Sequence, residues 1–246
     1  MTAPLSQHQA EIQSNLKAWQ HKPLLRRIYS DFYRRIVALI DPDLSGLIVE
    51  IGSGVGNLRS HLPQAISTDL FQNPWLDVVC DGYELPFIEG SLSHLILFDV
   101  FHHLRAPNAF LKEARRVLRQ GGRLILFEPY VSWFSYPVYH LLHHEPVAWR
   151  APINFAEEPP HPRDYYAAQG NATRLFFREQ RPAWPRGWTR YHSKAFASFS
   201  YLLSGGFSKP AFYPAWFMPW LQRWDERLSR WPGLFGVRCL VGLRVD

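Results

Sequence analysis

The sequence predicts an α/β protein whose seven-stranded, mostly parallel sheet has helices on both faces. Two observations support this prediction. Between residues 46 and 129, strand-like apolar segments alternate with helical segments, which favours parallel strands joined by right-handed crossovers. The first of these strands runs directly into a loop with glycine at every second position. Such a loop lets backbone N–H groups approach a ligand closely, so we expect a binding site at the carboxyl edge of the sheet.

Two helices are expected before the sheet, over residues 8–20 and 23–40. In the second, apolar residues recur at helical spacing, and Pro23 suits the first turn of a helix. We therefore interpret residues 1–45 as an amphipathic helical cap on the domain. The functional alternative is a lid over the binding site.

The segment 46–129 is expected to form the ligand-binding core. Its predicted strands are 47–51, 65–69, 76–80, 94–99 and 123–128, and its predicted helices are 56–62 and 107–119. The pair Gly121-Gly122 is typical of the left-handed end of a helix.

The remaining residues differ in composition, with 26 aromatic residues in 130–246 against twelve in 1–129. No period persists between 130 and 190, and prolines there interrupt any long helix, so we expect residues 130–192 to form an ordered but irregular insertion after the fifth strand, on the substrate side of the sheet. Residues 193–246 should complete the sheet. They contain a predicted helix over 193–204, a strand over 207–213, an aromatic amphipathic helix over 216–231 and a last strand over 238–245.

Gross composition restricts the class of protein. The longest apolar runs are too short for a membrane-spanning helix, and the N-terminus has no pattern of an export signal. Cys80 and Cys239 lie in apolar runs and are interpreted as buried thiols, so we expect a cytoplasmic protein. Net charge is +6, with an acidic core segment between basic flanks. Those flanks suit an acidic substrate, a membrane surface or nucleic acid, or they serve solubility alone.

The spacing of the glycine loop discriminates between ligands. A dinucleotide-binding turn would place its third glycine at position 57, which is Asn57. Here the order is Glu50-x-Gly52-Ser53-Gly54-x-Gly56, which resembles motif I of class I S-adenosylmethionine (SAM) methyltransferases. Four further segments resemble that family, and its small-molecule branch in particular, in order and spacing. The first is the acid that ends the second strand, in Asp69-Leu70, and the second is Asp81-Gly82 before Leu85-Pro86-Phe87. The third runs from Ser91 through Phe98-Asp99 to His102-His103-Leu104, and the fourth runs from Leu118 to Pro129.

This resemblance implies a Rossmann-like fold, a single methyltransferase domain over residues 1–246, and SAM as cofactor with S-adenosyl-L-homocysteine as product. It implies that Asp69 accepts hydrogen bonds from the ribose hydroxyls and that Asp81 accepts one from the adenine amino group, with Gly82 leaving room for the ring. The full set of residues expected to bind the cofactor is Glu50, Gly52, Ser53, Gly54, Gly56, Asp69, Leu70, Asp81, Gly82 and Phe98.

Catalytic residues are harder to predict, because the sulfonium already activates the methyl group and a base is needed only for a protonated nucleophile. His103 follows the fourth strand with His102, and the pair could act as a base or cap a turn. His143 and His144 belong to a cluster from His140 to Glu145 in which a helix would place His140 and His144 on one face. Our candidates are His103, His143 and His144. We expect no metal site, and we interpret His94 as structural.

The expected reaction is methyl transfer to an oxygen, nitrogen or carbon atom of a small-molecule or lipid-linked acceptor, with arginines that suit an acidic group. A nucleic-acid methyltransferase and a non-catalytic partner protein are the alternatives. Phe98-Asp99-Val100-Phe101 stands where base-methylating relatives carry N-P-P-[YF], so nucleic acid is not the expected partner. The tryptophans of 216–231 suit a peripheral membrane contact, the cover of the sheet or a homodimer.

Overall fold

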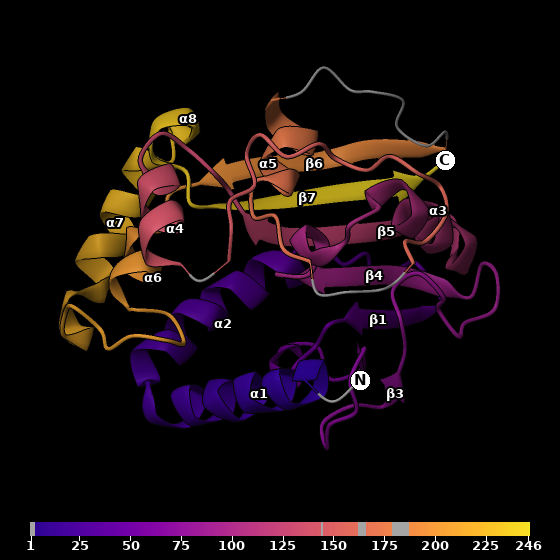
Figure 1. The fold of residues 1–246 in the computed structure, drawn as a ribbon, viewed down its shortest axis with the longest axis horizontal. Coiled ribbons are helices and arrows are strands. Elements are labelled where there is room, and N and C mark those ends of the chain that lie inside the picture. The colour runs from indigo at the N-terminus through magenta and orange to yellow at the C-terminus, as the bar shows by residue number, and fades with distance from the viewer. Residues whose placement is uncertain (1–2, 144, 162–165, 179–186) are drawn as a thin grey trace.

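The computed structural model describes residues 3–143, 145–161, 166–178 and 187–246. Within them the chain folds around a seven-stranded sheet with the order β3-β2-β1-β4-β5-β7-β6 (Figure 1). The strands are β1 Leu47–Ile51, β2 Ile66–Asp69, β3 Val78–Val79, β4 Leu92–Phe98, β5 Leu118–Pro129, β6 Trp188–Phe196 and β7 Arg238–Val245.

The pairing of the strands confirms a mostly parallel sheet. Strands β1 to β5 pair with one another in parallel, whereas β7 pairs antiparallel with both β5 and β6. Ile51 at the end of β1 lies opposite Thr68 of β2 and Leu97 of β4. The carboxyl ends of these strands therefore lie at one edge of the sheet, where the glycine loop begins.

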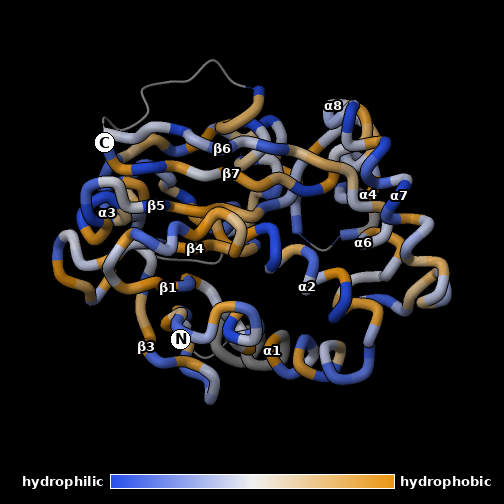
Figure 2. Tube along the Cα trace, turned by 180° about the vertical axis from the view of Figure 1, so that it is seen from behind, coloured by the Kyte–Doolittle hydropathy of each residue, from blue (hydrophilic) through white to orange (hydrophobic). Residues whose placement is uncertain are grey.

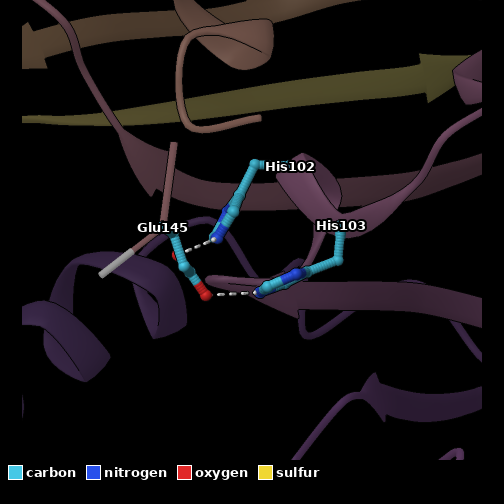
Figure 3. Close-up of side chains that lie close together, drawn as sticks. All are labelled: His102, His103 and Glu145. Atoms are coloured by element: carbon cyan, nitrogen blue, oxygen red, sulfur yellow. Dashed lines mark ion pairs between the residues drawn. The ribbon is translucent and has the colours of Figure 1, made fainter. Parts of the chain in front are cut away.

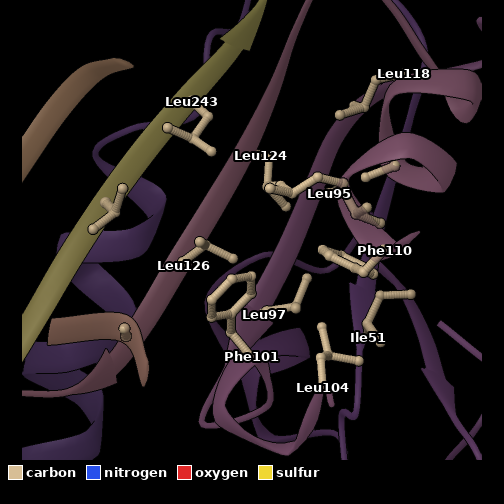
Figure 4. Close-up of a cluster of buried hydrophobic side chains, with 14 of the residues drawn as sticks. Ile51, Leu95, Leu97, Phe101, Leu104, Phe110, Leu118, Leu124, Leu126 and Leu243 are labelled. Carbon is tan, nitrogen blue, oxygen red and sulfur yellow. The ribbon is translucent and has the colours of Figure 1, made fainter. Parts of the chain in front are cut away.

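Helices cover both faces of the sheet, as predicted (Figure 1). α2 (Pro23–Val37) packs on the face that carries Ile96 and Phe98, and α3 (Pro107–Val117) packs on the face that carries Leu95 and Leu97. This alternation follows from the two-residue period of a strand. Figure 4 shows the α3 side of the core, with labelled side chains Ile51, Leu95, Leu97, Phe101, Leu104, Phe110, Leu118, Leu124, Leu126 and Leu243.

The position of each strand explains its sequence. Every residue of β4 is buried, because β1 and β5 flank it and helices cover both its faces. β6 is an edge strand and carries exposed polar residues among its buried ones. Figure 2 shows the same contrast, with predominantly hydrophobic tube along β1, β4 and β5 and mixed character along β6.

The N-terminal helices form where the sequence predicts them. α1 (Ala3–His21) is followed by α2, whose first residue is Pro23. Proline is favoured there because the first turn of a helix makes no use of its N–H. The buried face of α2 includes Tyr29 and Phe32, whose rings contact Phe98 of β4. α2 therefore lies directly behind the strand that leads to the predicted site.

The segment after β5 contains α4 (Ser135–Leu142), α5 (Asn171–Thr173) and a π-helical turn over Arg174–Arg178. It is tied to the sheet by specific bonds. The hydroxyl of Tyr139 donates to the carbonyl of Val237 at 2.7 Å, and Val131 N–H donates to Thr173 Oγ1 at 2.8 Å. Among the described residues, no helix combines the length and the apolar character needed to cross a bilayer.

Two predictions for the C-terminal part are wrong. The expected helix over 193–204 is divided between β6, which continues to Phe196, and the short α6 (Phe199–Leu203). α6 begins where it does because the carboxylate of Asp225 accepts hydrogen bonds from the N–H groups of Phe199 and Ser200. The expected strand over 207–213 has no regular structure, and β6 is the seventh strand instead.

Other elements agree more closely with expectation. The helix predicted over 216–231 is formed by a 3₁₀ turn (Ala215–Phe217) and α7 (Met218–Leu228), after which α8 (Pro232–Phe235) leads into the predicted last strand. The helix predicted over 56–62 is only a 3₁₀ turn, Asn57–Ser60. A second 3₁₀ turn, Phe101–His103, follows β4.

Candidate functional site

The glycine loop after β1 adopts a backbone that other residues rarely take. Gly52 and Gly54 have φ angles of 67° and 54°. A Cβ atom on Gly52 would lie 2.4 Å from Cγ2 of Val100, so the loop packs directly against the residues that follow β4. A Cβ atom on Gly54, in contrast, would meet no atom within 4 Å. The loop therefore exposes its backbone to open space at Gly54.

Asp69 holds this loop from the neighbouring strand. Its Oδ2 accepts a hydrogen bond from Gly54 N–H at 3.0 Å, and its Oδ1 accepts one from Leu70 N–H at 2.7 Å. Ser53 N–H donates to the carbonyl of Thr68 at 2.9 Å. The end of β2 thus fixes the path of the glycine loop.

Glu50, the last residue but one of β1, is buried, with 4% of its surface exposed. Its Oε2 has no hydrogen-bond partner within the described part of the chain. Burial, reinforced by the negative charge of Asp69, raises the pKa of Glu50 to about 8. A buried acceptor of this kind is costly unless a ligand donates to it.

The other residues predicted to bind the cofactor lie at the same edge but differ in exposure. Leu70 is half exposed, and the Oδ1 of Asp81 accepts a hydrogen bond from Tyr83 N–H at 2.9 Å. A Cβ on Gly82 would make only ordinary contacts with Phe110 and Ile51, so packing does not require glycine there. The ring of Phe98 is buried against α2, which leaves its backbone as the part able to face a ligand.

Glu128, in β5, organises the turn that follows β4. Its Oε1 accepts hydrogen bonds from the N–H groups of Val100 and Phe101 at 2.9 and 2.6 Å. Its Oε2 lies 2.6 Å from Nδ1 of His102. Glu128 is fully buried, so one carboxylate fixes both the backbone of the turn and the orientation of His102.

Two imidazoles and one carboxylate converge beside this turn (Figure 3). His102 Nε2 lies 3.4 Å from Oε2 of Glu145, and His103 Nε2 lies 3.4 Å from Oε1 of the same residue. Nδ1 of His103 lies 2.9 Å from the carbonyl oxygen of Tyr166. Gln169 donates from Nε2 to Oε2 of Glu145 at 2.9 Å.

Burial and charge act in opposite directions in this cluster. Burial would lower the pKa of His102, but Glu128 and Glu145 outweigh it and raise that pKa to about 10. Burial, together with the charge of His102, lowers the pKa of His103. Burial would raise the pKa of Glu145, but His102 and His103 hold it far below its usual range. The carboxylates of Glu128 and Glu145 therefore favour a positive charge between them.

His140 and His143 of the insertion lie near the end of α4 and directly after it. His140 lies on α4, which ends at Leu142, and His144 lies outside the described residues, so a face shared by His140 and His144 stays a prediction. His140 is exposed and stacks on Tyr136. His143 accepts at Nδ1 from Gln169 Nε2 at 2.7 Å, which places it beside the Glu145 cluster.

Sequence reasoning missed several members of this region. Glu145 was part of a noticed cluster, but its contacts with His102 and His103, more than forty residues earlier, gave no local signal. Glu128 and Gln169 had no predicted role. The clue to Glu128 in the sequence was an acid directly after the apolar run of residues 124–127.

The structural interpretations of three other residues are confirmed. Nε2 of the buried His94 accepts a hydrogen bond from Asp41 N–H at 2.9 Å, and burial lowers the pKa of His94 to about 4. Cys80 and Cys239 are buried free thiols.

Residues 49–126 match the sequence model of the family described as "Methyltransferase domain". A protein of Encephalitozoon cuniculi (strain GB-M1), named as a methyltransferase, is 30% identical over 122 residues. That match covers 44% of this chain and 52% of the relative, so the chain spans about half the length of the curated protein.

Solved methyltransferases share the fold over most of the chain. One, from Haloferax volcanii, was solved in complex with the Trm112 methyltransferase activator; it is 16% identical, with 98% and 96% of the two chains covered and a TM-score of 0.55. A SAM-dependent methyltransferase of Thermotoga maritima is 14% identical, with 96% and 99% covered and a TM-score of 0.53. Geranyl diphosphate C-methyltransferase of Streptomyces coelicolor A3(2), bound to Mg²⁺, geranyl diphosphate and S-adenosyl-L-homocysteine, is 13% identical, with 89% and 80% covered and a TM-score of 0.51. At these identities the likeness is one of fold.

Proposed function

We propose that this chain, which carries a class I SAM-dependent methyltransferase domain, transfers a methyl group from SAM to a small-molecule or lipid-linked acceptor. The observation that carries the proposal is the edge of the sheet where the open glycine loop, the loop-holding Asp69 and the buried Glu50 meet. SAM would supply a methyl group activated by its positive sulfur. The residues of the chain would then align the reactants and exclude water.

The residues at this edge fit such a cofactor. The Oε2 of Glu50, which has no hydrogen-bond partner among the described residues, is a suitable acceptor for the ammonium group of the cofactor's methionine part. The empty space beside Gly54 lets backbone N–H groups reach the ligand. The first feature is otherwise unfavourable for the fold, since it leaves a buried acceptor unsatisfied, and the second depends on a φ that glycine adopts readily and other residues do not.

Each predicted cofactor residue then receives a role. Asp69 and Asp81 would accept from the ribose hydroxyls and the adenine amino group, because a carboxylate serves two donors. Leu70 would cover part of the nucleoside from its half-exposed position. Gly52, Ser53, Gly56 and Gly82 would shape the loop and the strand ends, and Phe98 would contribute its backbone.

The acceptor would lie beyond the end of β4. His103 ends the 3₁₀ turn that follows β4, and His143 lies near the same region, because Gln169 contacts both His143 and Glu145. We propose His103 and His143 as residues that touch the acceptor, together with His144, which the described residues do not include. Glu145 joins them because it faces both His102 and His103.

An aromatic surface supports a lipid-linked acceptor. We define the tryptophan surface as Trp216, Trp220, Trp224 and Trp231, all between 40% and 78% exposed. α7 and α8, which carry or adjoin these residues, lie together at one end of the molecule (Figure 1). Exposed Arg223, Arg227 and Arg230 stand among them. Tryptophan and arginine side by side are typical of a helix that lies on a bilayer interface.

The test is methyl transfer from radiolabelled SAM to fractionated cell extract. We expect label in the small-molecule or lipid fraction, and no transfer by a variant with Asp69→Ala. Label confined to RNA or DNA would support the nucleic-acid alternative. Absence of S-adenosyl-L-homocysteine binding in calorimetry would overturn the proposed function altogether.

A further inference from the structure

We propose that His102, His103 and Glu145 form a binding site for a divalent transition-metal ion of the Zn²⁺ type. The three residues offer one ligand atom each, and these atoms lie within 4.8 Å of one another. Two histidines and one carboxylate are the protein ligands of several catalytic zinc and iron sites, which keep further positions open for water or substrate.

The tautomers of the two imidazoles are fixed by their other nitrogen atoms. Nδ1 of His103 faces the carbonyl oxygen of Tyr166, which can only accept, so this nitrogen carries the hydrogen. Nδ1 of His102 faces the carboxylate of Glu128 at 2.6 Å and is likewise a donor. Metal binding requires neutral imidazoles, and in each neutral ring Nε2 is then the nitrogen left to bind the ion. Metal-ligating histidines characteristically donate their second N–H to a carboxylate or a backbone carbonyl in this way.

The distances leave room for an ion between the ligand atoms. Each Nε2 lies 3.4 Å from an oxygen of Glu145, longer than an ordinary N–H···O bond of about 2.7–3.2 Å. Ligand atoms around a four-coordinate Zn²⁺ with bonds near 2.1 Å are separated by roughly 3.4 Å. Gln169 holds the carboxylate in place by donating to its Oε2.

The charges point the same way. Two carboxylates flank His102, the fully buried Glu128 and the 11% exposed Glu145, so positive charge between the three ligand atoms is favoured there.

A second group of possible ligands, Asp99, His102 and Glu128, is less suitable. Its histidine atom would be the Nδ1 that already donates to Glu128, and Asp99 is paired with Arg238. These groups are better understood as the support behind the first set.

The location gives the ion a use. His102 and His103 lie in the turn that follows β4, on the side where the acceptor is proposed to bind. An ion with open positions there would bind an oxygen of the acceptor and orient it. This use rests on the proposed function, whereas metal binding does not.

The experiment measures metal binding directly. Protein stripped with EDTA and transferred to chelator-free buffer is titrated with Co²⁺, followed by visible absorption, and then with Zn²⁺. We expect one Co²⁺ per chain with the absorption of a nitrogen- and oxygen-ligated ion, and displacement by Zn²⁺. His103→Ala and Glu145→Gln should each weaken binding by at least about tenfold. His140→Ala, an exposed histidine of the same insertion, is the matched control and should bind as the parent does.

Two results would overturn the site: no stoichiometric binding of either ion, or unchanged affinity in both His103→Ala and Glu145→Gln. Circular dichroism of the variants verifies that they are folded. S-adenosyl-L-homocysteine calorimetry on the same samples reports separately on the proposed function. Metal binding without nucleoside binding would uphold the site and reject the function, and the reverse pattern would reject only the site.

Discussion

Arg238, the buried first residue of β7, forms an ion pair with the partly buried Asp99, the residue that follows β4. Arg238 Nη2 donates to Asp99 Oδ2 at 2.7 Å, and the arginine side chain is only 2% exposed. Its guanidinium lies 4.6 to 5.9 Å from the ring centres of four aromatic residues, Phe32, Phe98, Phe127 and Tyr201. Asp99 has a φ angle of 57°, which is strained for a residue with a side chain. The pair therefore holds the chain in an unusual conformation next to the proposed site.

The first prediction concerns this ion pair. Arg238→Ala should reduce the free energy of unfolding by about 3–5 kcal/mol, because it leaves a partly buried carboxylate without its partner. Urea denaturation measures the change. Adding Asp99→Asn to Arg238→Ala should restore part of the loss, since the unpaired charge is then gone. A loss below about 1 kcal/mol for the single variant, within the range of exposed ion pairs, would contradict the argument.

The second prediction concerns the glycine loop. Gly54→Val should abolish S-adenosyl-L-homocysteine binding in calorimetry, because its side chain enters the open space where the ligand is proposed to lie. The positive φ also makes the substitution strained, by roughly 1–2 kcal/mol. Gly121→Val is the matched control, since Gly121 has a φ of 76° and equally open surroundings away from the loop. Both variants should lose similar stability, and only Gly54→Val should lose binding. Equal affinity in the two variants would show that the ligand does not use this space.

The central sheet and the glycine loop were predictable because local patterns encode them. Buried parallel strands such as β4 are uninterrupted apolar runs, and the loop glycines are needed for a backbone that their neighbours cannot adopt. The failures lie where distant contacts decide the structure. Residues 193–196 carry no clear strand signal, yet they extend β6 because β7 supplies its hydrogen-bond partners. α6 begins only at Phe199 because Asp225, on α7, caps it.

The candidate site likewise has one part that the sequence pattern predicts and one part that depends on distant contacts. Glu50, Asp69 and the loop are close in sequence to strand ends, so their convergence follows from parallel topology. The cluster of His102, His103 and Glu145 joins segments that no period or motif connects. A sequence pattern suggested pairing His140 with His144 on a helix, but α4 ends two residues after His140. Glu145, three residues after the end of α4, instead contacts His102 and His103 in the turn that follows β4.

The third prediction concerns the pH dependence of stability. In the ligand-free folded protein the pKa of Glu50 is raised to about 8 from its ordinary value of 4.5, so the carboxyl group keeps its proton over most of the range between these values. The folded state then binds more protons than the unfolded state between these values, so stability falls as the pH rises from about 4.5 to 8. Glu50→Gln should remove this contribution, which is at most a few kcal/mol at about 1.4 kcal/mol per pKa unit. Urea denaturation of both proteins from pH 5 to 8.5 measures the difference. Parallel curves for the two proteins would show that Glu50 is not protonated.

The fourth prediction concerns the ionisation of Glu50 in the complex. An ammonium-bearing ligand favours the carboxylate form, so affinity for S-adenosyl-L-homocysteine should rise with pH up to about 8 and binding should release a proton. Calorimetry in buffers of different ionisation enthalpy counts that proton. Glu50→Gln should bind more weakly and release none. Proton uptake by the parent protein would place the ligand's ammonium group elsewhere.

The fifth prediction concerns the tryptophan surface. Trp216→Ser and Trp220→Ser, combined, should weaken binding to vesicles that contain phosphatidylglycerol by at least about tenfold, because two large apolar side chains no longer enter the interface. Binding should also fall with added salt, since Arg223, Arg227 and Arg230 contribute about 1 kcal/mol each near an anionic surface. Co-sedimentation with vesicles measures both effects. Ile88→Ser, at an 81% exposed position in the loop before β4, is the control and should bind like the parent. If light scattering instead shows a dimer that the tryptophan variants dissociate, while none of the proteins binds vesicles, the surface contacts a second copy of the chain.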